Sequence, residues 1–543
     1  MNWRRAPVLA AAVALIPGLL AGCQTATPDS SIGPPSTEAT ITTTTTAPTP
    51  LLRVAVWGER GSSNWWASFG AGGASLDRAR QHGATASLFH VTGLEPVADL
   101  AELPVAVPRP LGEGWVVDQR IGVRRWSDGT PIVADDLVFY FETVRSMGLD
   151  GVHARRFPPE VVAVEALDDR TIRVRFDVVP GPGLWPGAVG LAPFVPARFW
   201  EAAGATDQLT LYGWAGESPP RAAEPRVEWL AAGDRDAAYR MLIAGDVDFV
   251  HDDEGMSGLD ADLVEELESA GGIEMVTSVR GELRVLAFNQ RSAPLDDPAF
   301  RLALATVVDR AAIAEQIGGA VADSFTRPSP TGEPGRPAGP GTFDGERLDR
   351  ASRVERALVM LMEAGHDVGS IRPLEILVSG SDPARVAAAE AASERMAELG
   401  LEVTVTALSP EDLAGRVLPP IRLDRATGWD MAVLGWRPTD PDPGELLAHL
   451  FGSAEDSVRA GGINVTGFRS PAFDRLVDRY RSTTDPGIAR ALLDEMELLL
   501  AAEVPQLPLY REVTKEAVRS GLAFIPVAGG IASNPASWPY QEP

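Results

Sequence analysis

Cys23 is the residue of this 543-residue sequence whose type and setting most directly predict a chemical modification. It is the only cysteine, and it directly follows Leu20-Ala21-Gly22. Upstream lie two arginines, Arg4 and Arg5, and then an apolar stretch over 6–20 that is too short to cross a bilayer. A positively charged N-terminal region, a short apolar region and small residues before a cleavage site are typical of a secretory signal peptide, which is removed from the mature protein.

A cysteine directly after such a cut resembles a lipobox, in which the thiol is diacylated and becomes the new N-terminus. We therefore expect residues 1–22 to be a lipoprotein signal peptide and Cys23 to be the site of lipidation. Two or more acyl chains hold a protein stably on a membrane, where a single chain does not. The alternative is an ordinary signal peptide with a chance cysteine. The mature chain is expected to work outside the cytoplasm.

The remaining residue types that carry chemistry show no catalytic or metal-binding spacing. The six histidines form no H-E-x-x-H pair, and the sequence contains neither a G-x-S-x-G elbow nor a second cysteine as nucleophile. His251-Asp252-Asp253-Glu254 offers cation ligands, although an acidic loop is more often a solvated one. Gly271-Gly272 and Gly318-Gly319 lack the context of a phosphate-binding loop. We expect no enzyme, no bound metal and no cofactor.

Charge and composition exclude further classes of function. The formal net charge is −27, which argues against nucleic-acid binding and against electrostatic docking on anionic lipid. With no cysteine beyond Cys23 there is no disulfide framework, so stability must come from a large core, for which 45% hydrophobic residues suffice. No later segment has the eighteen or so apolar residues expected of a membrane span. The lipid is therefore the expected anchor.

The residues after the anchor predict an unfolded linker and then a long mixed domain. Residues 23–50 are rich in Thr, Pro, Ser and Ala and cannot bury enough apolar surface to fold. Their composition predicts a disordered linker between the lipid and the folded domain. From 51 onward strand and helix signals alternate. Asp234–Gly245 reads as a capped helix, followed by a strand over Val247–Val250, and Asp297-Pro298 and Asp309 read as helix starts. This length suggests two or three domains.

Four motifs in the folded part, taken in order, resemble the extracytoplasmic solute-binding proteins of ABC importers, specifically family 5, the dipeptide/oligopeptide/nickel group. They span about 400 residues behind the lipobox, and most of their residues build turns and helix caps. The motifs are Trp126–Pro131 with Ala134–Phe141, then Leu242–Phe249, then Leu286–Asn289 with Pro294–Pro298 and Arg301–Arg310, and finally Gly435–Asp442 with Asn464, Phe468 and Pro471–Asp474.

The resemblance implies ligand contacts in the last of these motifs. In peptide binders of this group, an aspartate at the Asp-Pro step pairs with the ligand's α-ammonium, and Asp442 matches that position. Trp436 would add apolar or cation–π contact to the same group. Asp440 and Asn464 are further candidates from this motif. The alternative is that Asp442 is a solvated loop residue between two prolines.

Two family features are changed in this sequence. The stretch before the Trp126 motif is abbreviated to Gly114–Asp118, and the early "L-D-P" element is replaced by Ser63-Asn64-Trp65-Trp66. Both regions help line the ligand cleft in the family, so the ligand identity is not determined by the resemblance.

The fold class implied by the resemblance is α/β, the type II periplasmic-binding-protein fold, with two lobes, an additional domain, a ligand cleft between the lobes and hinge closure. The implied domains are a discontinuous domain I (51–75, 205–285 and 510–543), domain II (76–204) and domain III (286–509).

The expected function is that of a monomeric, lipid-anchored receptor of an ABC importer. It would capture short peptides or a similar small solute and pass them to a membrane permease and its ATPase. Two alternatives remain open. One is a lipoprotein of this fold that regulates or scaffolds cell-envelope assembly, and the other is a metal-chelate (nickel-type) receptor.

Overall fold

The computed structural model describes residues 52–58, 64, 66, 86–92, 95–149, 151–217, 219–222, 227–252, 255–322, 324–326, 348–418, 428–436 and 442–522. Contacts divide the chain into two units, 1–48 and 49–543, and every described residue belongs to the second. The predicted signal peptide, Cys23, the linker over 23–50 and Asp440 lie outside the described residues.

Helices and strands alternate along the described chain. The strands are β1 (Leu52–Val56), β2 (Phe89–Thr92), β3 (Glu95–Ala98), β4 (Arg109–Leu111), β5 (Gly114–Arg120), β6 (Val161–Asp168), β7 (Thr171–Phe176), β8 (Val227–Ala231), β9 (Phe249–Val250), β10 (Ile273–Phe288), β11 (Ala320–Val321), β12 (Leu374–Ser379), β13 (Val403–Leu408), β14 (Met431–Trp436) and β15 (Gln506–Arg519). The helices are α3 (Ala134–Met147), α4 (Gly151–Ala154), η1 (Gly183–Ala188), α5 (Ala197–Ala203), α6 (Gln208–Tyr212), α7 (Arg235–Ala244), α8 (Ala261–Ser269), α9 (Pro298–Val307), α10 (Arg310–Ile317), α11 (Arg350–Glu363), η3 (Val368–Ser370), α12 (Pro383–Ala397), α13 (Pro410–Val417), α14 (Pro443–Phe451), η4 (Ser453–Glu455), α15 (Pro471–Arg481) and α16 (Pro486–Glu503).

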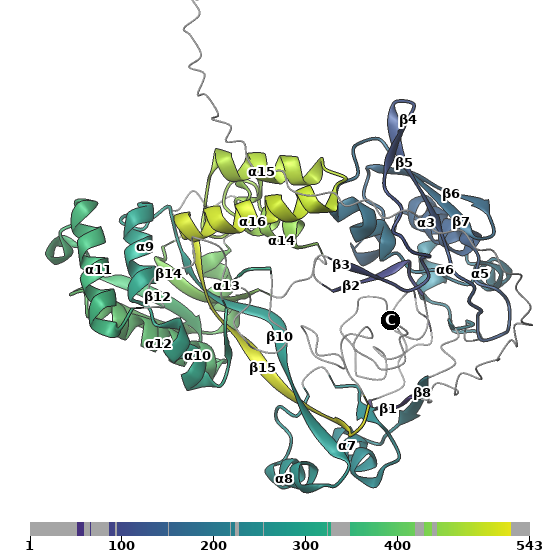
Figure 1. The fold of residues 1–543 in the computed structure, drawn as a ribbon, viewed down its shortest axis with the longest axis horizontal. Coiled ribbons are helices and arrows are strands. Elements are labelled where there is room, and N and C mark those ends of the chain that lie inside the picture. The colour runs from purple at the N-terminus through teal and green to yellow at the C-terminus, as the bar shows by residue number, and fades with distance from the viewer. Residues whose placement is uncertain are drawn as a thin grey trace, which may run out of the picture. The chain divides into compact units, whose positions relative to one another are not determined.

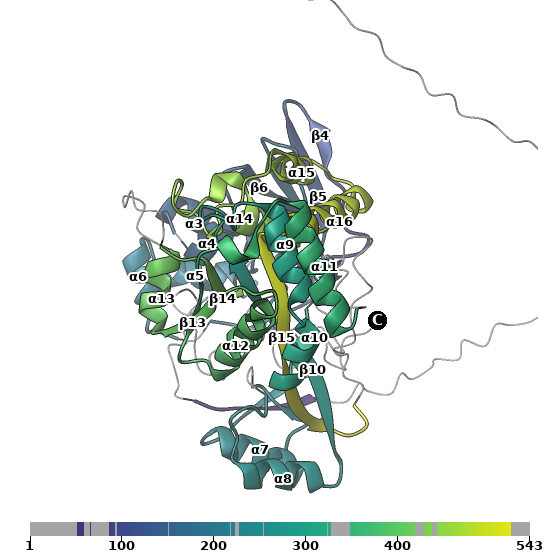
Figure 2. The same cartoon turned by 90° about the vertical axis from the view of Figure 1, so that its left-hand side faces the viewer.

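A large mixed sheet forms the frame of the described fold. Its strand order is β13-β12-β14-β10-β15-β9-β1-β8, with β11 paired to β15. The two long strands β10 and β15 pair antiparallel from Ile273↔Arg519 to Ala287↔Gln506 and run side by side in both views (Figures 1 and 2). They connect the parallel strands β1, β8 and β9 with the parallel strands β12–β14. The predicted domain boundaries at 285/286 and 509/510 fall within these two strands and remain a prediction.

The side-chain alternation of β10 explains how helices cover both faces of this sheet. Leu286 and Phe288 enter a cluster with residues of α9–α12, whereas Leu283 and Val285 enter another with residues of α14–α16. Because successive residues of a strand point to opposite faces, the two helical groups lie on opposite sides of β10. In Figure 1, α14, α15 and α16 lie together on one side of the long strands.

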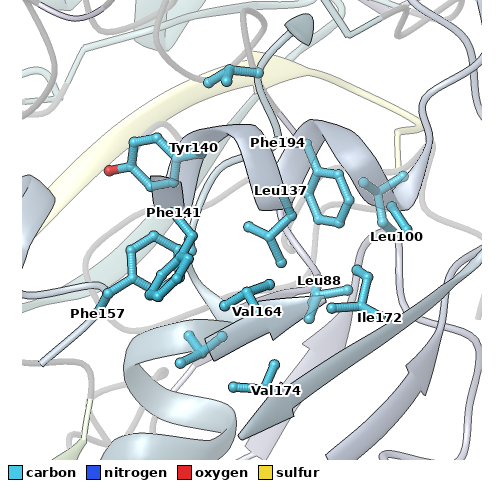
Figure 3. Close-up of a cluster of buried hydrophobic side chains, with 14 of the residues drawn as sticks. Leu88, Leu100, Leu137, Tyr140, Phe141, Phe157, Val164, Ile172, Val174 and Phe194 are labelled. Atoms are coloured by element: carbon cyan, nitrogen blue, oxygen red, sulfur yellow. The ribbon is translucent and has the colours of Figure 1, made fainter. Parts of the chain in front are cut away.

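A second, four-stranded antiparallel sheet has the order β4-β5-β7-β6. One of its faces is covered by α3, whose apolar side chains pack against those of β6 and β7 (Figure 3). Leu137 of α3 points toward Val164, Ile172 and Val174 of the strands (Figure 3). These side chains belong to one cluster of buried residues between 66 and 222, which we call the N-terminal cluster.

Local helix signals in the sequence are confirmed. Asp234 caps α7, and Gly245 follows it with a left-handed φ of 86°. Asp297 and Asp309 cap α9 and α10 through their side chains. The predicted strand over Val247–Val250 is shorter, because β9 begins only at Phe249. The Asp248 carboxylate accepts a 2.7 Å hydrogen bond from the backbone amide of Arg53, and the backbone amide of Asp248 donates a 2.7 Å hydrogen bond to the Arg53 carbonyl.

The Trp126 motif is structural in the described fold. The carboxylate of Asp136, in the first turn of α3, accepts hydrogen bonds from the indole of Trp126 and the backbone amides of Val133 and Ala197, each at 3.0 Å. This network holds the start of α3 and the start of α5 in place.

Candidate functional site

Asp442 lies at the start of α14 and is the N-cap of that helix. Its carboxylate accepts a 2.8 Å hydrogen bond from the backbone amide of Glu445, and Pro443 occupies the first helical position. An aspartate N-cap satisfies one of the free amides of the first turn, and proline at the next position has a φ suited to the helix. The Asp-Pro step noted in the sequence is therefore a helix start.

The phenol of Tyr480, on α15, orients the same carboxylate. Its hydroxyl lies 2.9 Å from Oδ2 and 3.1 Å from Oδ1 of Asp442 and donates to it. Burial raises the pKa of the Tyr480 hydroxyl, and the negative charge of Asp442 raises it further, so the hydroxyl keeps its proton and remains a donor.

Gly444 allows this arrangement. A Cβ at that position would lie under 3.0 Å from the Tyr480 ring, a distance that real Cβ atoms do not reach. Helices α14 and α15 therefore pack closely at the point where the Asp442 carboxylate is held.

The resulting site is a buried carboxylate. Asp442 is only 5% exposed. The Glu445 amide and the Tyr480 hydroxyl are both neutral donors, and they fix the carboxylate's direction. A carboxylate held in this way attracts cations more strongly than one in water, because the surroundings screen its charge less.

Trp436 is the last residue of β14. Residues 437–441, between Trp436 and Asp442 in the sequence, lie outside the described residues. The indole Nε1 of Trp436 donates a 2.7 Å hydrogen bond to Oε1 of Gln506, which is fully buried at the start of β15. The ring packs partly against residues of α14–α16. The Gln506 bond fixes the orientation of an aromatic face close in sequence to Asp442.

Asn464 is fully buried and holds a loop together. Its amide Nδ2 donates to the carbonyls of Gly452 at 3.1 Å, Phe468 at 2.9 Å and Phe451 at 3.4 Å. Its Oδ1 accepts from the Thr466 hydroxyl at 3.0 Å. These bonds give Asn464 a structural role in ordering the turns after α14. A direct ligand contact for Asn464 remains a prediction.

A buried group of ion pairs lies on the face of β10 and β14 opposite to the Trp436 side chain. Arg284 of β10, 4% exposed, forms ion pairs with Glu282 and Glu512. Burial alone would lower the pKa of Arg284, but these carboxylates outweigh it and raise that pKa, so the side chain stays charged. Gly435 of β14 pairs with Arg284 and leaves room for its guanidinium. These ion pairs join β10 to β15, next to the strand that ends at Trp436.

The changed segment Ser63–Trp66 is tied into the N-terminal cluster where it is described. Nδ2 of Asn64 donates to the carbonyls of Leu211 at 2.7 Å and Tyr212 at 2.8 Å. Trp66, only 1% exposed, packs tilted against Tyr140 with ring centroids 5.4 Å apart. In this chain, these two described residues of the segment contribute to the core.

Tyr480 and Gln506 are the site residues that the sequence did not indicate. Tyr480 lies 38 residues after Asp442 and Gln506 lies 70 residues after Trp436. No local pattern marks either of them, because each partnership arises only from tertiary structure: the packing of α14 on α15, and the position of β10 between β14 and β15.

Among the described residues, no group of three or more His, Cys, Asp or Glu side chains is arranged to hold a metal ion. Asp252, from the acidic stretch noted in the sequence, accepts hydrogen bonds from Arg235 at 2.7 Å and Tyr239 at 3.1 Å. Asp253 and Glu254 lie outside the described residues. The helices within the described ranges include none with the length and apolar content needed to span a membrane.

Comparisons with known proteins agree on one family. Residues 211–457 match the family described as "Bacterial extracellular solute-binding proteins, family 5 Middle". The chain is 23% identical to the probable deoxycholate-binding periplasmic protein YgiS of Escherichia coli, over 79% of this chain and 82% of that protein. It is 27% identical to di/tripeptide-binding protein 2 of Pseudomonas aeruginosa, over 44% of this chain and 42% of that protein.

Solved structures confirm the predicted fold. The unliganded open form of MppA, a periplasmic murein tripeptide binding protein, superposes with a TM-score of 0.66 at 17% identity, covering 91% of this chain and 96% of that one. The α/β fold of the type II periplasmic-binding-protein kind, predicted from the four motifs, is therefore the fold of this chain.

Proposed function

Because the chain belongs to the family 5 bacterial extracellular solute-binding proteins, we propose that it captures short peptides and delivers them to an ABC permease and its ATPase. The observation that supports a peptide ligand is the Asp442 carboxylate. It is buried, and two neutral donors hold it in one orientation. The free N-terminus of a short peptide brings the positive charge that such a carboxylate attracts.

The physics favours this pairing over a neutral ligand. An ammonium group enclosed by protein loses its hydration, which costs several kcal/mol unless a carboxylate compensates it. A hydrogen bond to a charged group contributes about 1.5–3 kcal/mol. Trp436, whose indole is fixed by Gln506, would lie over the same cation as an aromatic face. Micromolar affinity, about −8 kcal/mol, would suit capture followed by release.

The proposal includes attachment to the membrane. Cys23 would carry the lipid, and residues 24–50 would let the binding domain move about 80 Å from the surface when fully extended. One relative, YgiS of Escherichia coli, is described as a periplasmic protein. An extracytoplasmic, lipid-anchored location for this chain is what the predicted signal peptide and Cys23 imply.

The test is the variant Asp442→Asn, measured by calorimetry with trialanine and with N-acetyl-trialanine. Asparagine is also a good N-cap, so α14 should keep its start. We expect Asp442→Asn to weaken trialanine binding at least about tenfold, which corresponds to 1.4 kcal/mol. Acetylated peptide should bind wild type as weakly as free peptide binds the variant. Combining both changes should add little, because they remove the same interaction.

The chain offers a matched control in Asp485→Asn. Asp485 caps α16 in the same Asp-Pro-Gly context, and it accepts from the amides of Gly487 and Ile488. The variant Asp485→Asn should leave peptide affinity unchanged. Equal affinity of wild type for free and acetylated peptide would contradict the proposal. Native mass spectrometry of protein from its own host would then separate a metal chelate from an empty, scaffolding lipoprotein.

A further inference from the structure

A glycine- and proline-rich segment, Val179–Gly190, lies between the N-terminal cluster and the corner formed by α14 and α15. It contains glycines at 181, 183, 187 and 190 and includes η1. None of these four glycines has a left-handed φ, so glycine is not needed there for backbone freedom. What the positions share is a close neighbour where a Cβ would stand.

One side of the segment is anchored in the N-terminal cluster. The indole of Trp185, 4% exposed, donates a 2.8 Å hydrogen bond to the carbonyl of Ala106, and its ring lies 5.8 Å from that of Phe89. A Cβ on Gly190 would stand 2.6 Å from Cδ2 of Phe89. The segment therefore packs as part of this cluster.

The other side of the segment lies against α14 and α15. A Cβ on Gly181 would stand 2.7 Å from the carbonyl carbon of Arg481, the last residue of α15. A Cβ on Gly183 would stand 2.7 Å from Cγ of Glu445, in the first turn of α14. At Gly187 the nearest atom of the site is Cβ of Asp442, at 3.9 Å.

The two groups that the segment touches are fixed to each other and to the candidate site. Arg481 and Glu445 are joined by hydrogen bonds of 2.6, 2.9 and 3.1 Å, so Glu445 has little freedom to move aside. The backbone amide of Glu445 is the one that Asp442 caps. A contact with Glu445 is therefore one hydrogen bond away from the Asp442 carboxylate, and a contact with Arg481 is two hydrogen bonds away.

We propose that Val179–Gly190 is a closure strap. The strap packs against Arg481 and Glu445 when the N-terminal cluster approaches α14 and α15. This close packing requires glycine at 181 and 183. This packing covers the side of the Asp442 site that faces Gly187, and it stabilises the closed arrangement of the chain. That a ligand drives this closure rests on the proposed function. The packing contact itself does not.

The experiment measures closure by a distance between two spin labels. In a Cys23→Ser background the chain has no other cysteine, so Val162→Cys on β6 and Ile488→Cys on α16, 51% and 50% exposed, can be labelled selectively. Wild type should show a population of short distances. Gly181→Ala should lower the ratio of short to long distances about tenfold, because it forces a Cβ against backbone atoms.

Two further variants make the result specific. Gly183→Ala should also deplete the short population, and Gly183→Ala combined with Glu445→Ala should restore it, because the second change removes the side chain in the way. Gly233→Ala, with no atom within 4 Å of the added methyl and an ordinary φ, should leave the distances unchanged. A variant that fails to fold would be recognised by circular dichroism, and the Gly183 series would then decide.

An unchanged distribution in both Gly181→Ala and Gly183→Ala would overturn the strap, as would a wild type without a short population. Trialanine added to wild type should increase the short population. If trialanine binds by calorimetry and the glycine variants do not alter the distances, the strap is wrong. If the variants shift the distances and trialanine does not bind, the strap stands and the peptide proposal fails.

Discussion

The Tyr480 hydroxyl is a buried donor to Asp442, and its removal should cost stability. Tyr480→Phe leaves the buried carboxylate short of a hydrogen bond, so the free energy of unfolding should fall by about 1–3 kcal/mol. Urea denaturation measures this change. Tyr510→Phe is the matched control, because the Tyr510 hydroxyl is buried and has no hydrogen-bond partner within the described structure. A loss as large in Tyr510→Phe would show that the hydrogen bond is not the cause.

Asp430 should make the chain sensitive to acid. Burial alone would raise the pKa of its carboxyl, but hydrogen bonds from Arg372 and Ser292 outweigh this and hold that pKa below its usual value of 3.8. A lowered folded-state pKa stabilises the fold above the unfolded-state value, and this stabilisation is lost as the pH falls through the folded-state value.

The variant Asp430→Asn tests this sign. The difference in unfolding free energy between wild type and Asp430→Asn should be constant from neutral pH down to about pH 4 and should shrink below it. Denaturant titrations at several pH values measure the difference. A difference that grows on acidification would contradict the assignment of the carboxylate as the stabilising form.

At the scale of elements, two glycines in helices predict opposite effects of the same substitution. Gly444→Ala forces a methyl group against the Tyr480 ring and should destabilise the packing of α14 on α15 by about 1–3 kcal/mol. Gly415→Ala lies within α13 with no atom within 4 Å, so it should stabilise by about 0.5–1 kcal/mol. Thermal and urea unfolding compare the two. Stabilisation by Gly444→Ala would refute the close approach of these helices.

The helix starts could be predicted from the sequence because their signals are local. Asp234, Asp297 and Asp309 each cap the helix that follows them, and each bond spans only two or three residues. The strand ending at Val250 was predicted two residues too long, and it pairs with Val54 and Ala55, which lie far away in the sequence. Local chemistry determines where a helix begins, whereas strand pairing depends on partners elsewhere.

The candidate site shows the same division. Asp442 and Trp436 could be named from a motif. The residues that orient them could not, since Tyr480 and Gln506 approach only through tertiary packing. The sequence also did not indicate that Asn464 uses its amide to hold three carbonyls. A motif identifies the type of side chain at a position, and the fold determines what that side chain binds.

At the scale of the molecule, β10 and β15 form the mechanical connection between the strands near β1 and those near β12. Their pairing is interrupted between Val279 and Leu283 and again between Arg284 and Val285. Irregular pairing weakens the ladder locally and increases its twist. The buried Arg284 ion pairs lie between these two interruptions. The ribbon is thus held by charge at the place where its hydrogen bonding is least regular, which suits a connection that bends.

The final prediction concerns attachment of the whole chain. Cys23→Ala removes the only thiol, so it should release the protein from the membrane fraction, while the fold of 49–543 stays unchanged because Cys23 belongs to the other unit. Cell fractionation and circular dichroism measure the two effects. Wild type should stay with membranes through high-salt washes, because acyl chains bind by the hydrophobic effect and not by charge. As a control, protease treatment of intact wild-type cells should release the folded domain by cutting within 24–50, the segment whose composition predicts a linker. A Cys23→Ala protein that remains on membranes would show that another part of the chain is the anchor.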